Sequence, residues 1–231
     1  MIWCVVPAAG SGQRFGGELP KQYAPLLDQP MLLRTLDRLL AHPRIKGAMV
    51  ALAADDGYWP GITELEGKPI LTCSGGAERA QSVLNALDAL AQAIAPPSWL
   101  LVHDAARPCV RHDDIDRLLD QGLVHADGAI LAAPVSDTIK RGDAGHGIVE
   151  SVPRRNLWRA LTPQLFRFDD LRSALRTAIA EPQGAAGITD EAAAIERRGG
   201  RPLLIAGAAD NIKVTTLIDL ALAELILTRP Q

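Results

Sequence analysis

Short apolar segments alternate along the chain with longer segments of helical periodicity, and this alternation limits the fold more than any other feature. The apolar segments are nearly continuous hydrophobic runs, which is typical of strands covered on both faces of a sheet. Alternating strands and helices of this kind form a three-layer α/β/α fold, Rossmann-like, with a mainly parallel sheet. The expected strands are 2–6, 48–53, 99–103, 129–134 and 203–206, and the expected helices are 31–41, 78–92, 113–122, 170–180, 189–197 and 215–227.

One segment interrupts this alternation. Residues 135–152 hold two short β-prone pieces on either side of a glycine-rich turn at 142–147, which indicates a β-hairpin. The segment has few large apolar residues, so a hairpin here buries little surface by itself. Two interpretations fit: an ordinary surface hairpin, or a protruding arm at about residues 135–156 that packs on a second subunit.

Length and charge exclude several classes of protein. The 231 residues fit one domain, 1–231, and 24 basic against 27 acidic side chains give no excess of positive charge for duplex nucleic acid. Cys4, Cys73 and Cys109 are too scattered for a disulfide framework or a zinc site. The apolar N-terminus is too short for a signal peptide, and Asp219 and Glu224 interrupt the longest candidate membrane segment. We therefore expect a reduced, cytoplasmic protein with no nucleic-acid or membrane partner.

A glycine-rich loop, PAAGSGQRFGGELPK at residues 7–21, follows the first expected strand. Successive backbone N–H groups in such a loop can hold phosphate oxygens. Phe15 stands where the dinucleotide fingerprint has its third glycine, and the Walker A lysine is absent. Three prolines between residues 20 and 30 prevent a long helix from starting here, so the positive charge has to come from Arg14 and Lys21. An ordinary strand–helix turn with two solvated cations is the alternative.

Asp104 directly follows the third expected strand, where ligands of open α/β sheets bind. A carboxylate at this place can hold Mg²⁺, which prefers oxygen ligands and keeps several waters, or can accept a hydrogen bond from a sugar hydroxyl. A turn or capping role is the alternative. His103 has no partner at metal-ligand spacing, so we expect it to be structural.

Six ordered segments carry a more specific signal than any of them alone. They are AAGSGQR at 8–14 with PKQY at 20–23, GGAERAQSV at 75–83, HDAARP at 103–108, ALTPQ at 160–164, TDE at 189–191 and NIKVT at 211–215. Together they resemble the sugar-nucleotide-type nucleotidyltransferases and, more narrowly, the 2-C-methyl-D-erythritol 4-phosphate cytidylyltransferase family. The resemblance covers essentially the whole chain.

The resemblance implies CTP as co-substrate, methylerythritol phosphate as acceptor, and Mg²⁺ or another divalent cation held by Asp104. The residues implied to contact CTP are Pro7, Ala8, Ala9, Gly10, Gly12, Gly76, Ser82, Asp104 and Ala105. The residues implied to hold the acceptor are Asp104, Thr138, Arg154, Thr162, Thr189 and Lys213, and those implied in catalysis are Arg14, Lys21, Arg154 and Lys213.

The resemblance also implies a homodimer, because Thr138 and Arg154 are implied to come from the neighbouring subunit's arm. Arg155 lies next to Arg154, so the choice between the two arginines stays open. Thr189 precedes an alanine-rich helix, and a helix N-cap explains it as well as acceptor binding does.

The implied reaction transfers CMP from CTP to the acceptor and releases pyrophosphate. A phosphate monoester is largely dianionic at neutral pH, because its second pKa lies near ~6, so no general base is needed. The alternatives are CMP transfer to another polyol phosphate, such as ribitol 5-phosphate, and a non-catalytic nucleotide-binding protein on the same fold. The chain ends 16 residues after Thr215, so we expect no fused second enzyme.

Overall fold

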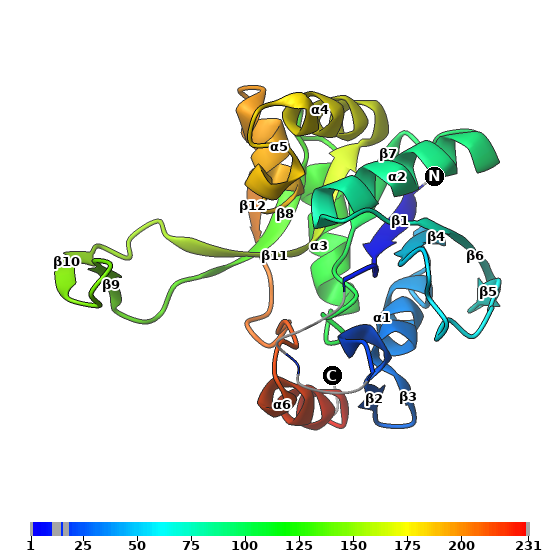
Figure 1. Ribbon diagram of the computed structural model, residues 1–231, viewed down its shortest axis with the longest axis horizontal. Coiled ribbons are helices and arrows are strands. Elements are labelled where there is room, and N and C mark those ends of the chain that lie inside the picture. The colour runs from blue at the N-terminus through cyan, green and yellow to red at the C-terminus, as the bar shows by residue number, and fades with distance from the viewer. Residues whose placement is uncertain (1, 11–14, 16–18, 230–231) are drawn as a thin grey trace.

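The computed structural model of the protein describes residues 2–10, 15 and 19–229. Its centre is an eight-stranded sheet with the strand order β12-β8-β11-β7-β1-β4-β6-β5 (Figure 1). Neighbouring strands are parallel except at β11, which runs antiparallel to both β7 and β8, and at β5, which runs antiparallel to β6. The strands are β1 Ile2–Pro7, β4 Ile45–Leu52, β5 Glu64–Leu65, β6 Lys68–Ser74, β7 Trp99–Val102, β8 Ala129–Pro134, β11 Trp158–Arg167 and β12 Leu203–Ala206.

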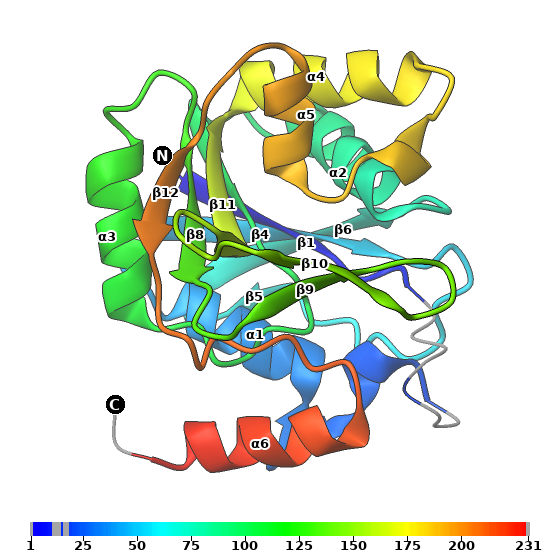
Figure 2. The same ribbon diagram turned by 90° about the vertical axis from the view of Figure 1, so that its left-hand side faces the viewer.

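Helices cover both faces of this sheet (Figure 2). Side chains alternate between the faces along each strand. In β1, Cys4 and Val6 pack in the core layer that holds α1 and α3, whereas Trp3 and Val5 pack in the layer that holds α2, α4 and α5. This confirms the predicted three-layer fold. The helices are α1 Met31–Leu40, α2 Arg79–Ala93, α3 His112–Gly122, α4 Phe168–Ala180, α5 Glu191–Arg197 and α6 Leu217–Leu227.

Three strands of the sheet, β5, β6 and β11, are missing from the strands expected on sequence, and β5 is only two residues long. β6 contains Pro69, and only Ile70 of its seven residues is fully buried. β11 contains Pro163 and two buried polar residues, Thr162 and Gln164. These features remove the continuous apolar run that identifies a buried strand. The six expected helices and five expected strands are all present.

The proline-rich segment after the glycine-rich loop forms no long helix, as expected. It folds into a short 3-10 turn, η2 at Lys21–Tyr23, and a small hairpin of β2 at Pro25–Leu26 with β3 at Gln29–Pro30. Among the described residues, no helix is long and apolar enough to cross a membrane.

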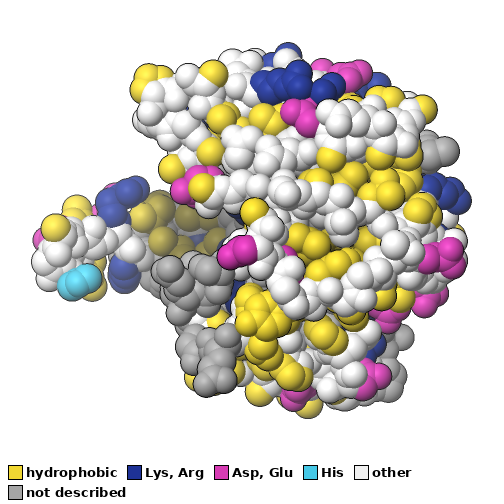
Figure 3. Space-filling view, turned by 45° about the vertical axis from the view of Figure 1, so that its right-hand side comes forward, with side chains coloured by type: hydrophobic (Ala, Val, Ile, Leu, Met, Phe, Trp, Pro, Cys, Tyr) yellow, Lys and Arg dark blue, Asp and Glu magenta, His cyan; other side chains and the backbone are white. Residues whose placement is uncertain are grey.

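The predicted hairpin is present and is formed by β9 at Ile139–Gly142 and β10 at Ile148–Val152. Asp143 closes its turn, because Oδ1 of this residue accepts hydrogen bonds from the N–H groups of Gly145 (2.9 Å) and Gly147 (2.8 Å). In the space-filling view the hairpin stands clear of the body and carries Lys and Arg side chains (Figure 3). The hairpin therefore protrudes from the body of its own chain (Figure 3).

Candidate active site

The carboxyl ends of β1, β6 and β7 open onto one cavity of about 350 Å³. Ligands of open α/β folds bind at this edge of the sheet. Lys21 and Lys213 line this cavity. It is also lined by every described residue that the sequence assigns to the nucleotide, namely Pro7, Ala8, Ala9, Gly10, Gly76, Ser82, Asp104 and Ala105. Gly12 and Arg14 lie outside the described residues.

Hydrogen bonds between side chains and the backbone, together with close packing, fix the walls of this first cavity. Gln22, which follows Lys21, donates its side-chain N–H to the carbonyl oxygen of Ala8 (2.7 Å) and so holds the 3-10 turn against the loop after β1. Gly75 approaches that loop so closely that a Cβ atom added to it would lie 2.5 Å from Cβ of Ala9. The Ser82 hydroxyl accepts the N–H of Gly76 (3.0 Å) and thereby shapes the entry to α2.

A second cavity of about 220 Å³ adjoins the first. β11 contributes Thr162 and Gln164 to its lining, and the segment before α5 contributes Thr189. Three residues line both cavities and form what we call the shared wall: Arg79, Asp104 and Lys213.

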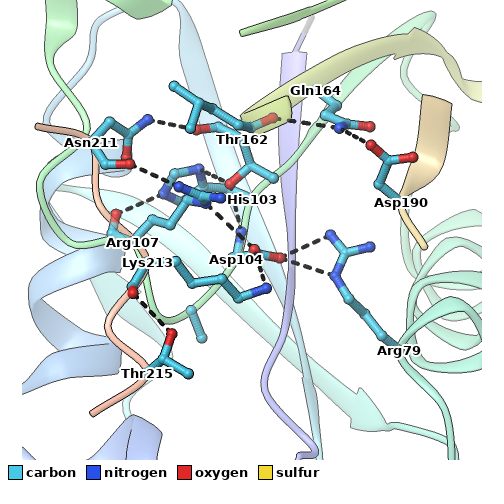
Figure 4. A network of polar contacts seen from close by, with 12 residues as sticks. Arg79, His103, Asp104, Arg107, Thr162, Gln164, Asp190, Asn211, Lys213 and Thr215 are labelled. Carbon is cyan, nitrogen blue, oxygen red and sulfur yellow. Dashed lines mark hydrogen bonds and ion pairs between the residues drawn. The ribbon is translucent and has the colours of Figure 1, made fainter. Parts of the chain in front are cut away.

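Asp104 is the centre of the shared wall and is only 7% exposed (Figure 4). Arg79 donates from Nε to Oδ1 (2.9 Å), while Nζ of Lys213 lies 2.9 Å from Oδ2 and Nε of Arg107 lies 3.5 Å from the same oxygen. Burial alone would raise the pKa of this carboxyl, but the three cations hold it well below its usual range. Asp104 is therefore ionised at neutral pH.

Thr162 contacts the backbone of Asp104 and the ring of His103. Its hydroxyl accepts the backbone N–H of Asp104 (3.1 Å) and contacts Nδ1 of His103 (3.0 Å). Nε2 of His103 lies 2.9 Å from the carbonyl oxygen of Arg107, so this nitrogen carries the proton and Nδ1 accepts from Thr162. Burial lowers the pKa of His103 to about 4, so the ring is neutral. The predicted structural role of His103 agrees with these contacts.

Asn211 joins β11 to the segment that carries Lys213 (Figure 4). It is fully buried and donates from Nδ2 to the backbone carbonyl oxygen of Thr162 (2.8 Å). Its own backbone carbonyl oxygen accepts a hydrogen bond from the Arg107 guanidinium (2.8 Å). Lys213 therefore lies two residues after a position that two buried hydrogen bonds hold in place. The sequence motif contained Asn211 and Arg107 but assigned no role to either.

Comparison with known proteins identifies the family of the chain. The family model described as 2-C-methyl-D-erythritol 4-phosphate cytidylyltransferase matches residues 2–229. A protein of that name from Stenotrophomonas maltophilia (strain K279a) is 54% identical over 228 residues, which is 99% of this chain and 97% of the relative. The chain belongs to the 2-C-methyl-D-erythritol 4-phosphate cytidylyltransferase family. It is therefore an enzyme of the nucleotidyltransferase class.

Solved structures of this family have the same fold. A crystal structure of 4-diphosphocytidyl-2C-methyl-D-erythritol synthase is 35% identical, with a TM-score of 0.83 and coverage of 98% of each chain. The 2-C-methyl-D-erythritol 4-phosphate cytidylyltransferase of Francisella tularensis is 33% identical, with a TM-score of 0.81, over 97% of this chain and 99% of that one.

The cytidylyltransferase motif Thr189-Asp190-Glu191 has a different capping residue from the one expected. Asp190, not Thr189, is the N-cap of α5, because Oδ1 of Asp190 accepts the N–H of Ala193 (2.9 Å). Gln164 holds this cap in place by donating to Oδ2 of Asp190 (2.9 Å). Thr189 is consequently not used as a cap, and its exposed side chain lines the second cavity.

Thr138 and Arg154 do not reach the site of their own chain. Both are exposed on the arm, and neither lines the two cavities. Arg154 donates instead to the carbonyl oxygen of Ser136 within the arm. Of the cytidylyltransferase residues assigned to the acceptor, one chain thus brings together Asp104, Thr162, Thr189 and Lys213.

The described residues offer no multi-ligand metal centre, since no group of three or more His, Cys, Asp or Glu side chains is placed to hold an ion. Asp104 is the carboxylate that lines both cavities, and its Oδ2 is paired with Lys213. Mg²⁺ is commonly held by one or two carboxylates together with substrate phosphates. A single carboxylate beside a phosphate-binding cavity fits that kind of site, provided that Lys213 moves from Asp104 to a phosphate.

Proposed function

We propose that the chain transfers CMP from CTP to 2-C-methyl-D-erythritol 4-phosphate, giving 4-diphosphocytidyl-2-C-methyl-D-erythritol and pyrophosphate. The observation that carries the proposal is the pair of adjoining cavities with one shared wall. A transfer between two bound substrates needs two sites whose reacting ends meet. The names of the relatives favour this activity over a non-catalytic nucleotide-binding protein.

CTP is assigned to the first cavity. The small residues at 7–10 let its phosphates approach the backbone, and Gly76 with Ser82 face the cytosine in this proposal. Lys21 neutralises charge that grows on the phosphates during transfer, together with Arg14, whose place lies outside the described residues. Such charge stabilisation commonly supplies the largest part of catalysis.

The acceptor is assigned to the second cavity, with its phosphate toward Lys213 and its hydroxyls toward Thr162, Thr189 and Asp104. A phosphate oxygen of the acceptor forms a bond to the α-phosphorus of CTP, and the bond from that phosphorus to the bridging oxygen breaks. Pyrophosphate leaves with the electron pair. The acceptor phosphate is already dianionic at neutral pH, so no side chain has to remove a proton.

A divalent cation, Mg²⁺ in the first instance, is assigned to Asp104. When bound, it would neutralise negative charge on the triphosphate, as such ions do in phosphoryl transfer. The residues of the chain act around it: Asp104 supplies one oxygen, and Arg79 keeps that carboxylate in place.

The arm is assigned to a homodimer in which Thr138 and Arg154 complete the acceptor site of the neighbouring subunit, with Arg155 as the alternative to Arg154. This assignment is supported by their exposure and by their absence from the lining of both cavities of their own chain. Arg suits the task because its fork can hold two phosphate oxygens at once.

The test is the release of pyrophosphate from CTP, followed with methylerythritol phosphate and with ribitol 5-phosphate as separate acceptors. We expect release with methylerythritol phosphate and little or none with ribitol phosphate or with CTP alone. Release with ribitol phosphate alone would overturn the acceptor and retain the class of reaction. No release with any polyol phosphate would overturn the activity.

A further inference from the structure

One guanidinium group in the shared wall is held between two carboxylates. Arg79 donates from Nε to Oδ1 of Asp104 (2.9 Å), and its two terminal nitrogens donate to Oε1 (2.6 Å) and Oε2 (3.0 Å) of Glu191. Together, Glu191 and Asp104 raise the pKa of Arg79 against the effect of burial. We call this chain of contacts, Asp104–Arg79–Glu191, the carboxylate bridge.

The carboxylate bridge joins three elements that are distant in sequence. Arg79 is the first residue of α2, Asp104 follows β7, and Glu191 is the first residue of α5. Arg79 and Asp104 line both cavities, and α5 begins two residues after Thr189, which lines the second cavity. The bridge is therefore placed to set the positions of both substrate sites relative to each other.

Glu191 itself does not face either substrate site. Its side chain is 1% exposed and lines neither cavity, whereas Arg79 lines both. Any influence of Glu191 on the reaction consequently passes through Arg79. A buried carboxylate of this kind is expensive, because an apolar pair of similar volume often stabilises a fold as well or better.

We infer that Glu191 is a positioning residue for the transfer proposed above: it fixes Arg79, and through Arg79 it orients the Asp104 carboxylate between the two substrates. The inference rests on the proposed function. Glu191 binds both terminal nitrogens of Arg79, and one of them, Nη2, also lies 2.9 Å from Oδ1 of Asp104, so Glu191 fixes the plane in which the guanidinium meets that carboxylate. Oδ2 of Asp104 then stays directed at Lys213.

The first test replaces Glu191 by glutamine. Glutamine keeps the size of the side chain, but it places an N–H group opposite an Arg79 donor. We expect kcat to fall about 10- to 100-fold, because a misplacement near 1 Å has effects of this size, while the Kd for CTP changes less than about threefold. The matched control is Glu196→Gln, which changes an exposed carboxylate on the same helix and should leave both constants unchanged.

The second test removes both charges. Arg79→Met with Glu191→Leu leaves no buried ion unpaired and should fold even if Glu191→Gln does not. We expect the double variant to be no slower than Arg79→Met alone, because Glu191 acts only through Arg79. Normal kcat in a folded double variant would show that the bridge is merely structural. Losses that multiply in the double variant would show that Glu191 acts independently of Arg79.

A crystal structure of the Glu191→Gln variant provides a reading that does not depend on activity. The inference expects the Arg79 guanidinium to turn out of the plane in which Nε and Nη2 now face Oδ1 of Asp104, and the carboxylate of Asp104 to rotate with it. Unchanged positions of both side chains would overturn it. The wild-type assay separates the two claims, since an inactive wild-type enzyme would overturn the proposed function, and this structure would still decide whether Glu191 positions Asp104.

Discussion

At the scale of single residues, the site is organised by the charge of Asp104. Three cations surround this buried carboxylate, and two of them, Arg79 and Lys213, also line both cavities. Because these charges are already held in place before substrate arrives, little reorganisation is needed when charge develops on the phosphates. The negative charge of the carboxylate also offsets the electrostatic repulsion among these cations.

Lys21 is the described cation that we assign to the phosphates of CTP. Replacing it by alanine should lower kcat by about 10²- to 10³-fold, because it removes a cation from the developing phosphate charge. The fold should survive, since the side chain lies at a cavity wall rather than in the core. Steady-state kinetics and a thermal unfolding curve check both statements. Near-normal turnover would remove Lys21 from the mechanism, and Lys46→Ala, at an exposed position outside both cavities, is the control.

His42 predicts how stability depends on pH. Its buried ring accepts the N–H of Arg44 at Nδ1 (3.3 Å) and contacts Oδ1 of Asp116 through Nε2 (3.1 Å), a pattern that fits the neutral ring. Burial lowers the pKa of His42, although Asp116 opposes this. As the pH falls below about 6.5, the unfolded chain takes up a proton that the folded ring does not. The free energy of unfolding should therefore decrease.

Urea unfolding between pH 7.5 and 5.5 measures this effect, and His42→Gln should show a shallower decrease than the wild type. The exposed His146 provides the control, because His146→Gln should keep the wild-type dependence. Equal slopes for His42→Gln and the wild type would contradict the prediction.

The local motifs made Asp104 and Lys213 predictable from the sequence, because a carboxylate after a buried strand and a lysine in a specific motif are visible there. The partner of Arg79 was not predictable. Glu191 lies 112 residues further along the chain, and only the packing of α5 on α4 and of α4 on α2 brings the two together. The role of Asn211 was not predictable for the same reason, since its hydrogen bond to Thr162 joins residues that are 49 positions apart.

At the scale of elements, β11 is the antiparallel strand that lies between β7 and β8 in an otherwise mainly parallel sheet. It supplies Thr162 and Gln164 to the second cavity, and it leads directly from the arm into the core. Alternation of strands and helices predicted the parallel part of the sheet. It missed β11 because buried polar side chains, present here to support Asp104 and Asp190, interrupt the hydrophobic run.

Gly128 tests the packing of β11 against the turn that precedes β8. It has a positive φ of 77°, and a Cβ atom there would lie 2.3 Å from the carbonyl oxygen of Leu165. Gly128→Ala should lower the free energy of unfolding by about 2–4 kcal/mol, from the strained backbone and the overlap together. Urea denaturation measures this loss.

Gly199→Ala is the matched control for that variant, since Gly199 has a φ of 82° but open space around its Cβ position. It should cost only the backbone contribution, about 1–2 kcal/mol. Equal losses in the two variants would show that contact with β11 adds nothing.

At the scale of the whole molecule, the arm projects from the body and leaves the acceptor cavity without Thr138 or Arg154 from the same chain (Figures 1 and 3). In the proposed homodimer each site combines the body of one subunit with the arm of the other. This assignment makes a prediction about mixed subunits that no single-chain site would make.

Two inactive variants should restore activity when their subunits exchange. Arg154→Met damages the arm and Lys213→Met damages the body, so a mixed dimer contains one intact site and one doubly damaged site. With equal amounts and random exchange, about a quarter of wild-type activity should return, because half of the dimers are mixed. Assays before and after exchange through mild denaturant measure the recovery. Absence of recovery in verified mixed dimers would contradict the assignment of the arm. Arg155→Met in place of Arg154→Met decides between the two arginines.

The central claim is that a phosphate oxygen of methylerythritol phosphate attacks the α-phosphorus of CTP. The most direct measurement labels the three non-bridging phosphate oxygens of the acceptor with ¹⁸O and follows the label by mass spectrometry after the enzyme has acted. Attack by the acceptor phosphate predicts that all three labels appear in 4-diphosphocytidyl-2-C-methyl-D-erythritol and that pyrophosphate carries none. Release of CMP and pyrophosphate with the labelled acceptor left unchanged would contradict it.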